Sequence, residues 1–511
     1  MYLTQGLHRA IQATPDKPAT IFGERTRTFA EHGDRVARFA GALQELGVAP
    51  GDRVAILGLN SDRYAEYLVG TPWAGGVVNP VNIRWSPKEI AYSLKDSGTK
   101  ILLIDDAFAA MAEPLRQNCP DLEQLIHIGE GPTPEGMLSY EHLLAESDPV
   151  VDAGRRGEDL LGIFYTGGTT GFPKGVMLSH NNMYTSALGT VACGELLGHG
   201  ATFLHAAPMF HLADLAAWAG QVILGGTHVM IPMFEPTAVL KAVQDHKVTD
   251  VLLVPMMIQV LVDHPSMGEF DVSSMTRMLY GGSSISEGVL ARAMASFPGI
   301  RMTQAYGMTE VAPVATLLLP DDHHGKYLRS GGRAAPHSEV SIVDADGNPA
   351  PLGQVGEIRV RGKHVMQGYW NKPEESAAVM RDGWYHTGEG GYLDEEGFVY
   401  VVDRLKDMIV TGGENVYSAE VESALSKHPA VASVAVIGLP DETYGERVHA
   451  VVVPAPGASP TVQELRDFCG QEIARYKAPR TIDFVQELPL SGAGKILKRE
   501  LRAAYREGLE S

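Results

Sequence analysis

The 511-residue sequence is poor in cysteine, in long apolar runs and in basic residues, and each shortage excludes a class of protein. Its three cysteines, Cys119, Cys193 and Cys469, are far apart and lack metal-ligand spacing. This excludes a disulfide framework or a zinc site and predicts buried thiols in a reducing compartment. No apolar run reaches the roughly 18 residues that cross a membrane, and the N-terminus lacks a signal-peptide core. We therefore expect a soluble cytoplasmic protein.

Basic residues are also outnumbered, since 42 Lys and Arg face 62 Asp and Glu and the formal net charge is −20. This charge argues against general nucleic-acid binding, although it permits a local basic patch for a nucleotide. The 44% hydrophobic and 20% charged composition is typical of a folded chain. A single core rarely grows beyond roughly 250–300 residues, so the length predicts several domains.

Helix and strand patterns alternate through the first 300 residues. Val36, Phe39 and Leu43 lie at helical spacing within residues 34–46, and Gly47 is a suitable end. Repeated units of this kind with continuous apolar strands predict an α/β fold of mostly parallel sheets covered by helices. The other segments with these patterns are 64–69 and 87–94 for helices, and 54–57, 76–78, 101–104, 251–254, 278–280 and 300–303 for strands.

Beyond about residue 321 the pattern changes to short β-like segments separated by turns, which predicts a small β subdomain extending to residue 404. A compact α/β pattern follows the charged connector. Thr461 and Glu464 form a capping box that opens a helix carrying Leu465, Phe468 and Ile473. We therefore predict an N-terminal domain of residues 1–404 and a mobile C-terminal domain of residues 405–511. The other predicted strands are 339–343, 357–360, 399–402, 431–437 and 448–453.

The most informative stretch is YTGGTTGFPKG, residues 165–175, directly behind an apolar run at 161–164. We interpret it as a strand, a phosphate-binding turn and a helix start at 179–182. It is not a Walker A loop, because Lys174 follows Pro173 and precedes Gly175. A glycine-rich surface loop is the alternative. The candidate phosphate ligands are the backbone N–H groups of Gly167 and Gly168, the hydroxyls of Thr166, Thr169 and Thr170, and the charge of Lys174.

These eleven residues closely resemble the phosphate loop of the adenylate-forming superfamily, which includes acyl-CoA synthetases, luciferases and peptide-synthetase adenylation domains. Later segments resemble the same family in the same order, so the resemblance covers most of the chain and is closest to fatty-acid or aryl-acid CoA ligases. These segments are YGGSS at 280–284, YGMTE at 306–310, GEIRVRG at 356–362, WYHTGE at 384–389 and PLSGAGKI at 489–496.

The resemblance implies a role for each matching residue in nucleotide binding. Glu310 would bind Mg²⁺, with Thr166 as a second oxygen ligand. Thr309 would donate to the α-phosphate. The adenine would lie against Gly281, Gly282, Ser283, Tyr306 and Gly307.

Further roles follow for the acyl, ribose and CoA positions. His211 would lie beside the acyl carboxylate and the thiol tunnel. Lys495 would bridge the attacking carboxylate and the α-phosphate. The ribose would be held by Arg404 and by Glu389, where the family normally has Asp; Lys406 would be the hinge, and Gly412 and Gly413 would approach the pantetheine arm.

The resemblance implies an AMP-forming acid–CoA ligase that uses ATP, Mg²⁺ and CoA. A carboxylate attacks the α-phosphorus and expels pyrophosphate, and the CoA thiol then displaces AMP after the C-terminal domain has rotated about Lys406.

Small residues at 212–220 would leave an apolar channel and favour a medium- or long-chain fatty acid; an aryl acid is the alternative substrate. Carrier-protein loading, a luciferase-like oxygenase and an ATP-binding sensor are the rival functions. A homodimer is left open.

Overall fold

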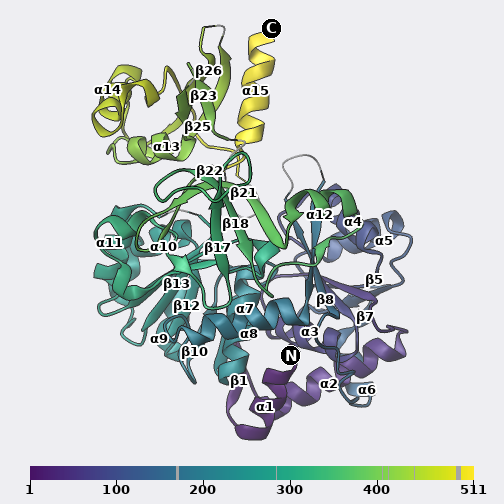
Figure 1. Cartoon of the computed structure of the whole chain (residues 1–511). Coiled ribbons are helices and arrows are strands. Elements are labelled where there is room, and N and C mark those ends of the chain that lie inside the picture. The colour runs from purple at the N-terminus through teal and green to yellow at the C-terminus, as the bar shows by residue number, and fades with distance from the viewer. Residues whose placement is uncertain are drawn as a thin grey trace. The chain divides into compact units, whose positions relative to one another are not determined.

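The computed structural model describes residues 1–167, 172–283, 285–404, 407–412, 414–441, 443–490 and 496–510 (Figure 1). Its chain forms two compact units: residues 1–340 with 360–385, and residues 341–359 with 386–511. The chain passes from one unit to the other within the strands β17 (Glu339–Val343), β18 (Gly356–Arg361) and β21 (Trp384–Leu393). The predicted α/β class, with mostly parallel sheets in the larger unit, is confirmed.

A nine-stranded sheet forms one half of the first unit. Its six central strands are parallel, and the edge strands β2, β15 and β16 are antiparallel to their neighbours. In spatial order the strands are β16 (Arg333–Ala334), β15 (Thr316–Leu318), β14 (Arg301–Tyr306), β13 (Arg277–Gly281), β12 (Asp250–Leu253), β10 (Thr202–His205), β11 (Thr227–Met230), β1 (Pro18–Phe22) and β2 (Arg25–Thr28).

An eight-stranded sheet forms the other half. The strand predicted at 54–57 lies at its centre with every side chain buried, which explains its continuous apolar sequence. In order the strands are β19 (Gly368–Tyr369), β9 (Lys174–Ser179), β8 (Leu160–Thr166), β4 (Val77–Pro80), β3 (Arg53–Leu57), β5 (Thr99–Ile104), β6 (Gln124–His127) and β7 (Leu138–Ser139); β9 pairs antiparallel with both β8 and β19.

Local capping signals fix several helix ends. The helix predicted from residue 34 begins at Phe29, because Thr28 and Glu31 form a capping box. The helix predicted at 87–94 extends to Ser97 and ends at Gly98, which has φ +60°. The α-helices of this unit are α1 (Gln5–Ala13), α2 (Phe29–Glu45), α3 (Asp62–Trp73), α4 (Pro87–Ser97), α5 (Ala112–Asn118), α6 (Tyr140–Glu146), α7 (His180–Ala192), α8 (Leu212–Leu224), α9 (Pro236–His246), α10 (Pro255–Val262), α11 (Glu287–Ser296) and α12 (Pro373–Val379).

The described chain forms two further five-stranded sheets: one of β17, β18, β20 (Met380–Arg381), β21 and β22, and one in the second unit, packed on helices, of β23 to β27. Helix α14 (Val462–Glu472) of this unit begins at the predicted Thr461–Glu464 capping box. The prediction that this helix carries Ile473 is wrong, because Ile473 is extended and ends the helix. The remaining elements are β22 (Val399–Arg404), β23 (Ile409–Thr411), β24 (Glu414–Val416), β25 (Val431–Asp441), β26 (Gly445–Pro454), β27 (Thr481–Phe484), α13 (Ser418–Ser426) and α15 (Lys498–Glu510).

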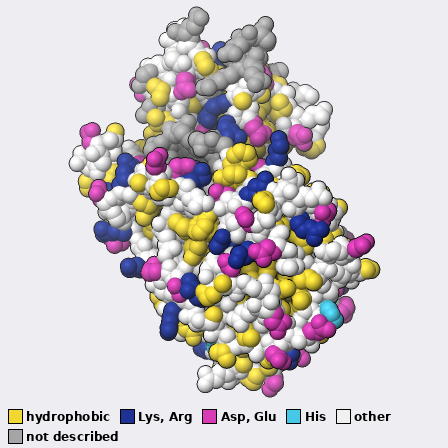
Figure 2. Space-filling view, turned by 90° about the vertical axis from the view of Figure 1, so that its right-hand side faces the viewer, with side chains coloured by type: hydrophobic (Ala, Val, Ile, Leu, Met, Phe, Trp, Pro, Cys, Tyr) yellow, Lys and Arg dark blue, Asp and Glu magenta, His cyan; other side chains and the backbone are white. Residues whose placement is uncertain are grey.

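Three further expectations can be compared with the described residues. Among them, no helix is long and apolar enough to cross a membrane. All three cysteines are free, but Cys193 is only half-buried, so the prediction of buried thiols is wrong for this residue. On the face drawn in Figure 2, Lys and Arg side chains lie interspersed with Asp and Glu, although acidic residues predominate in the whole chain.

Candidate active site

The predicted phosphate loop joins two antiparallel strands. β8 pairs with β9 so that Thr166 lies opposite Lys174, and the Thr166 hydroxyl is 3.5 Å from the Lys174 carbonyl oxygen. Thr166 and Lys174 are therefore close at the two ends of the loop. A Cβ on Gly167 would lie within 4 Å of no described residue. The predicted ligands Gly168, Thr169 and Thr170 lie outside the described residues.

The helix start predicted for this motif is not part of the loop. Ser179 does cap α7, with Asn182 completing a capping box, but β9 separates that cap from Lys174. Five residue steps of extended strand span roughly 17 Å, which is too far for the N-terminus of α7 to act on an anion held at Lys174. The predicted strand and the helix start at Ser179 are confirmed, but the interpretation misses β9, which separates the loop from α7.

Tyr369 connects two of the predicted catalytic residues. It lies in β19 opposite Val176 of β9. Its hydroxyl donates to Glu310 Oε1 at 2.9 Å, and Lys174 Nζ lies 5.0 Å from the centre of its ring. Lys174 also pairs with Glu375 of α12. The structure thus brings Lys174 and Glu310 to the same tyrosine.

Burial, with the nearby Glu310 carboxylate, raises the pKa of Tyr369 far above its usual range. The phenol therefore stays protonated and can only donate its hydrogen to Glu310. Sequence analysis missed Tyr369, because nothing in the local pattern links it to a residue 59 positions upstream. Thr309 begins the short 3₁₀ helix Thr309–Val311 that contains Glu310.

The predicted adenine positions gather at the carboxyl ends of two parallel strands, where open α/β sheets bind ligands. β13 and β14 pair with Gly281 opposite Ala305. A Cβ on Gly281 would lie 2.3 Å from the Ala305 carbonyl oxygen, and one on Gly307 would lie 2.0 Å from the Pro313 oxygen. Close backbone packing therefore requires both glycines independently of any nucleotide.

The other positions predicted for adenine lie at the same sheet edge. Gly282, with φ +82°, and Ser283 follow β13, and Tyr306 ends β14. Two adjacent histidines, His323 and His324, lie near this edge of the sheet and differ in burial. His323 is half-buried, and its Nε2 is 3.0 Å from the Tyr280 hydroxyl, while His324 is exposed.

His211 occupies the position just before α8, and its segment is held by a residue that sequence analysis missed. Asn60 Nδ2 donates to the carbonyl oxygens of His205 and Ala207 at 3.2 and 2.9 Å, and Asn60 Oδ1 accepts from Met209 N at 2.8 Å. Asn60 is only 3% exposed. It therefore fixes the backbone that leads to His211, and no signal in the sequence singles it out.

Several of the small residues that follow His211 are packed in the core. Trp218 is 1% exposed, Ala217 and Ala219 belong to the core, and a Cβ on Gly220 would lie 2.5 Å from Leu197 Cδ1. These side chains are small because neighbouring elements pack against them. Ala213 is exposed and Ala216 is half-buried, so the preference for a long acyl chain stays a prediction.

The second unit contains the predicted ribose and CoA positions. β21 and β22 pair with Glu389 directly opposite Arg404, and Glu389 N donates to Thr387 Oγ1 at 3.1 Å. Gly412, with φ +61°, lies in the turn between β23 and β24. An isolated bridge between Leu490 and Ile496 brackets the predicted catalytic loop. The predicted residues Lys406, Gly413 and Lys495 lie outside the described residues.

The residues present fit a magnesium ion that is completed by phosphate oxygens. Within the described part of the chain, no group of three His, Cys, Asp or Glu side chains forms a metal cage. Mg²⁺ in nucleotide enzymes is bound by one or two carboxylates together with substrate phosphates. A carboxylate has about four lone-pair sites, so the bond from Tyr369 leaves Glu310 able to ligate.

Comparison with known proteins identifies the family. Residues 7–370 match the family model described as AMP-binding enzyme, and residues 420–495 match that of the AMP-binding enzyme C-terminal domain. The chain belongs to the AMP-binding enzymes. The predicted adenylate-forming ligase is thereby confirmed.

Similar proteins cover almost the whole chain. Feruloyl-CoA synthase of Amycolatopsis sp. is 38% identical over 97% of this chain and 98% of its own. Fatty acid–[acyl-carrier-protein] ligase ScoC of Streptomyces coeruleorubidus is 36% identical over 97% and 94%. The anthranilate CoA ligase AuaEII in complex with anthranoyl-AMP superposes with a TM-score of 0.93 at 27% identity, covering 100% of this chain and 98% of that one.

Proposed function

We propose that this AMP-binding enzyme is an acid–CoA ligase that uses ATP, Mg²⁺ and CoA to activate a carboxylic acid with an apolar body through its acyl-adenylate. The observation that carries the proposal is the contact of Tyr369 with both Glu310 and Lys174, in a chain that matches both family models. Residues 1–404 and 405–511 would be its functional domains.

Each residue of the site would have a distinct task. Lys174 and the loop at 166–170 would hold the phosphates of ATP, while Thr309 donates to the α-phosphate. Tyr369 would fix the orientation of Glu310. Mg²⁺, when bound by Glu310 and Thr166, supplies positive charge that balances the phosphate oxygens. Positioning and electrostatics would then provide most of the acceleration without a protein nucleophile.

The remaining predicted residues would complete nucleotide and thiol binding. Glu389 and Arg404, which are paired across β21 and β22, would hold the ribose hydroxyls. His211 would lie beside the acyl carboxylate. Gly412 and Gly413 would let the backbone pass close to the pantetheine arm of CoA, because glycine has no side chain to obstruct it.

We propose an apolar carboxylic acid as the substrate, and either a fatty acid or an aryl acid as its specific class. An apolar acid is common to both predicted classes, fatty acids and aryl acids. Feruloyl-CoA synthase and the medium/long-chain-fatty-acid–CoA ligase FadD8 of Mycobacterium tuberculosis, 36% identical over 98% of this chain and 89% of its own, represent the two classes among similar proteins. Rates with aliphatic acids of increasing length and with cinnamates and benzoates would rank the two.

An acyl-carrier protein is a second candidate acceptor, favoured by the similarity to ScoC. The identity of the acyl acceptor can be tested directly, because CoA and an acyl-carrier protein carry the same kind of thiol on different molecules. Acyl transfer to free CoA supports the proposal. Transfer to a carrier protein alone would favour the second candidate.

Lys495→Ala separates the two half-reactions. We expect the variant to lose pyrophosphate release from ATP and acid, while it still forms the thioester from supplied acyl-AMP and CoA. Arg499→Ala, four residues further along in α15, is the matched control for losing one positive charge. Equal loss of both half-reactions in Lys495→Ala would contradict its assignment to adenylation.

A further inference from the structure

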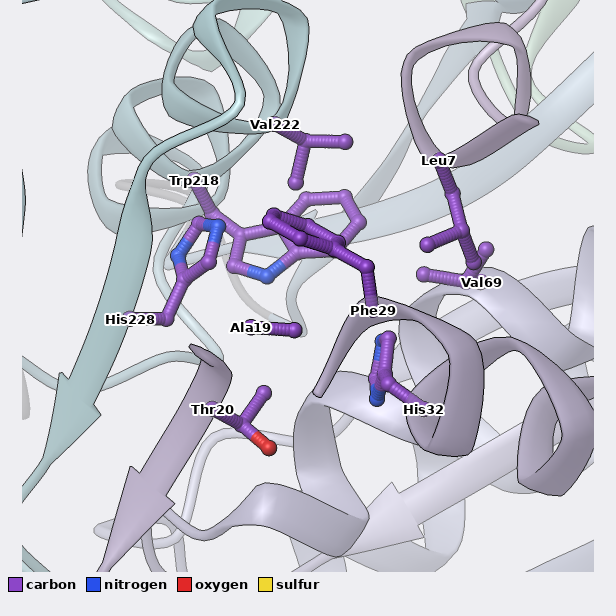
Figure 3. Close-up of a pocket in the computed structure, with 9 residues that line it drawn as sticks. All are labelled: Leu7, Ala19, Thr20, Phe29, His32, Val69, Trp218, Val222 and His228. Carbon is purple, nitrogen blue, oxygen red and sulfur yellow. The ribbon is translucent and has the colours of Figure 1, made fainter. Parts of the chain in front are cut away.

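The small cavity drawn in Figure 3 is closed to the substrates. The space open to the centre of a water-sized sphere is about 10 Å³, and its lining is mostly apolar. A single water needs about 10–15 Å³ on this measure. The cavity therefore cannot hold ATP, whose phosphates we assign to the loop at 166–170.

Helix α4 contacts this loop at both of its ends. Tyr92 and Asp96 lie four residues apart in the helix and so project from the same face. The Tyr165 hydroxyl donates to Asp96 Oδ2 at 2.6 Å. The Phe172 ring is stacked on the Tyr92 ring, with ring centres 4.5 Å apart and 15° between the ring planes. Tyr165 and Phe172 lie on either side of the loop in the sequence, so one helix face holds both of its ends.

Asp96 fixes the strand end that leads into the loop. Tyr165 belongs to β8 and lies opposite Gly175 of β9. Burial, with the nearby Asp96 carboxylate, raises the pKa of Tyr165 far above its usual range. The phenol therefore stays protonated and donates its hydrogen to Asp96.

Asp96 also holds the segment that follows Tyr369. Its carbonyl oxygen lies in the last turn of α4, where carbonyl groups lack partners within the helix. Trp370 Nε1 and Asn371 Nδ2 donate to this oxygen at 2.8 and 3.1 Å. The loop and Tyr369, which contacts Glu310, are therefore anchored to the same helix end.

Tyr92 holds the other end of the loop. Phe172 is 58% exposed, so core packing does not fix it. Tyr92 lies between Ile90 and Leu94, which belong to the core, and it presents Phe172 with a fixed surface. An aromatic pair favours its stacked arrangement by roughly 2- to 10-fold.

We propose that Tyr92 and Asp96 are positioning residues for ATP, which act through Phe172 and Tyr165 to hold the two ends of the phosphate loop in place before the nucleotide binds. The inference rests on the proposed function, because it assigns the phosphates to this loop. The apparent Kd of a ligand rises as the fraction of protein in the binding-competent arrangement falls. Loosening either anchor should therefore weaken ATP binding, although neither side chain is assigned a contact with ATP.

Isothermal titration calorimetry of the full chain with ATP tests the anchor at Tyr92. Tyr92→Leu removes the stack but keeps an apolar side chain that suits a helix, and we expect the Kd for ATP to rise roughly 2- to 10-fold. Tyr92→Phe keeps the ring and should keep the wild-type Kd. An unchanged Kd in Tyr92→Leu, or an equal rise in Tyr92→Phe, would overturn the role of the stack.

Two further variants test the anchor at Asp96. Tyr165→Phe removes only the donating hydroxyl, and we expect the Kd for ATP to rise by up to about 10-fold. Asp96→Asn keeps an acceptor oxygen and should stay near the wild-type value. An unchanged Kd in Tyr165→Phe would overturn the role of Asp96. If Tyr92→Leu fails to fold, Tyr165→Phe still decides whether the anchored loop matters for ATP.

Kinetics separate positioning from a loss of general stability. Positioning of the loop predicts that Tyr92→Leu raises the KM for ATP and leaves the KM for the acid and the kcat at saturating ATP near their wild-type values. An equal rise in both KM values would overturn the proposal. Because ATP binding needs neither an acid nor CoA, the comparison of Kd values still decides if no acid is activated. A wild-type protein that binds no ATP would overturn both this proposal and the proposed function.

Discussion

Replacing Asn60 by alanine should destabilise the first unit and disturb the segment that leads to His211. The substitution removes two hydrogen-bond donations, to the carbonyl oxygens of His205 and Ala207, and leaves the buried Met209 N–H without its acceptor. Leaving a buried group unsatisfied costs about 1–3 kcal/mol. Because the three groups are neighbours and can relax together, we expect a total loss of about 3 kcal/mol.

Urea unfolding followed by tryptophan fluorescence measures this loss. All five tryptophans lie in the first unit, so their signal reports on that unit alone. Asn181→Ala is the matched control, because Asn181 donates to Glu158 in an exposed position. We expect the control to change the free energy of unfolding by less than about 0.5 kcal/mol. An Asn60→Ala protein as stable as the control would refute the assigned role of Asn60.

Three further predictions concern ionisable side chains. Burial lowers the pKa of His32 from 6.5 to about 4. Between pH 6.5 and 4 the unfolded chain therefore binds a proton at His32 that the folded chain does not bind, so the free energy of unfolding falls as the pH falls through this range. Urea unfolding should show a loss of up to about 3 kcal/mol, and His32→Gln should reduce this loss. Tyr369→Phe should raise the Mg²⁺ concentration for half-maximal rate roughly 10-fold by releasing Glu310; an unchanged value would contradict this positioning role. Glu375→Gln should lower the KM for ATP by freeing Lys174, and an unchanged KM would show that the pair does not compete with phosphate.

Local signals in the sequence predicted much of the fold. Buried parallel strands need apolar residues on both faces, so the continuous apolar run at residues 54–57 predicts β3. The capping box joins Thr461 and Glu464, which are only three residues apart, so the local sequence also predicts the start of α14. The end of α14 was misplaced because Ile473 is apolar at helical spacing, although its backbone is extended.

The failures arose where long-range contacts decide the structure. The sequence pattern predicts a loop and a helix start where β9 lies, because the identity of β9 as a strand depends on antiparallel pairing with β8 and β19. Tyr369 and Asn60 were missed for the same reason. Their partners lie 59 and at least 145 residues away along the chain, and no local spacing encodes such a contact.

The most direct test of the proposed function is pyrophosphate release by the purified protein with Mg·ATP, measured across aliphatic and aryl acids, each with and without CoA. We expect CoA to stimulate turnover with an apolar acid, and mass spectrometry to identify the matching acyl-CoA. Bound ATP without pyrophosphate release from any acid would contradict the ligase and favour an ATP-binding sensor.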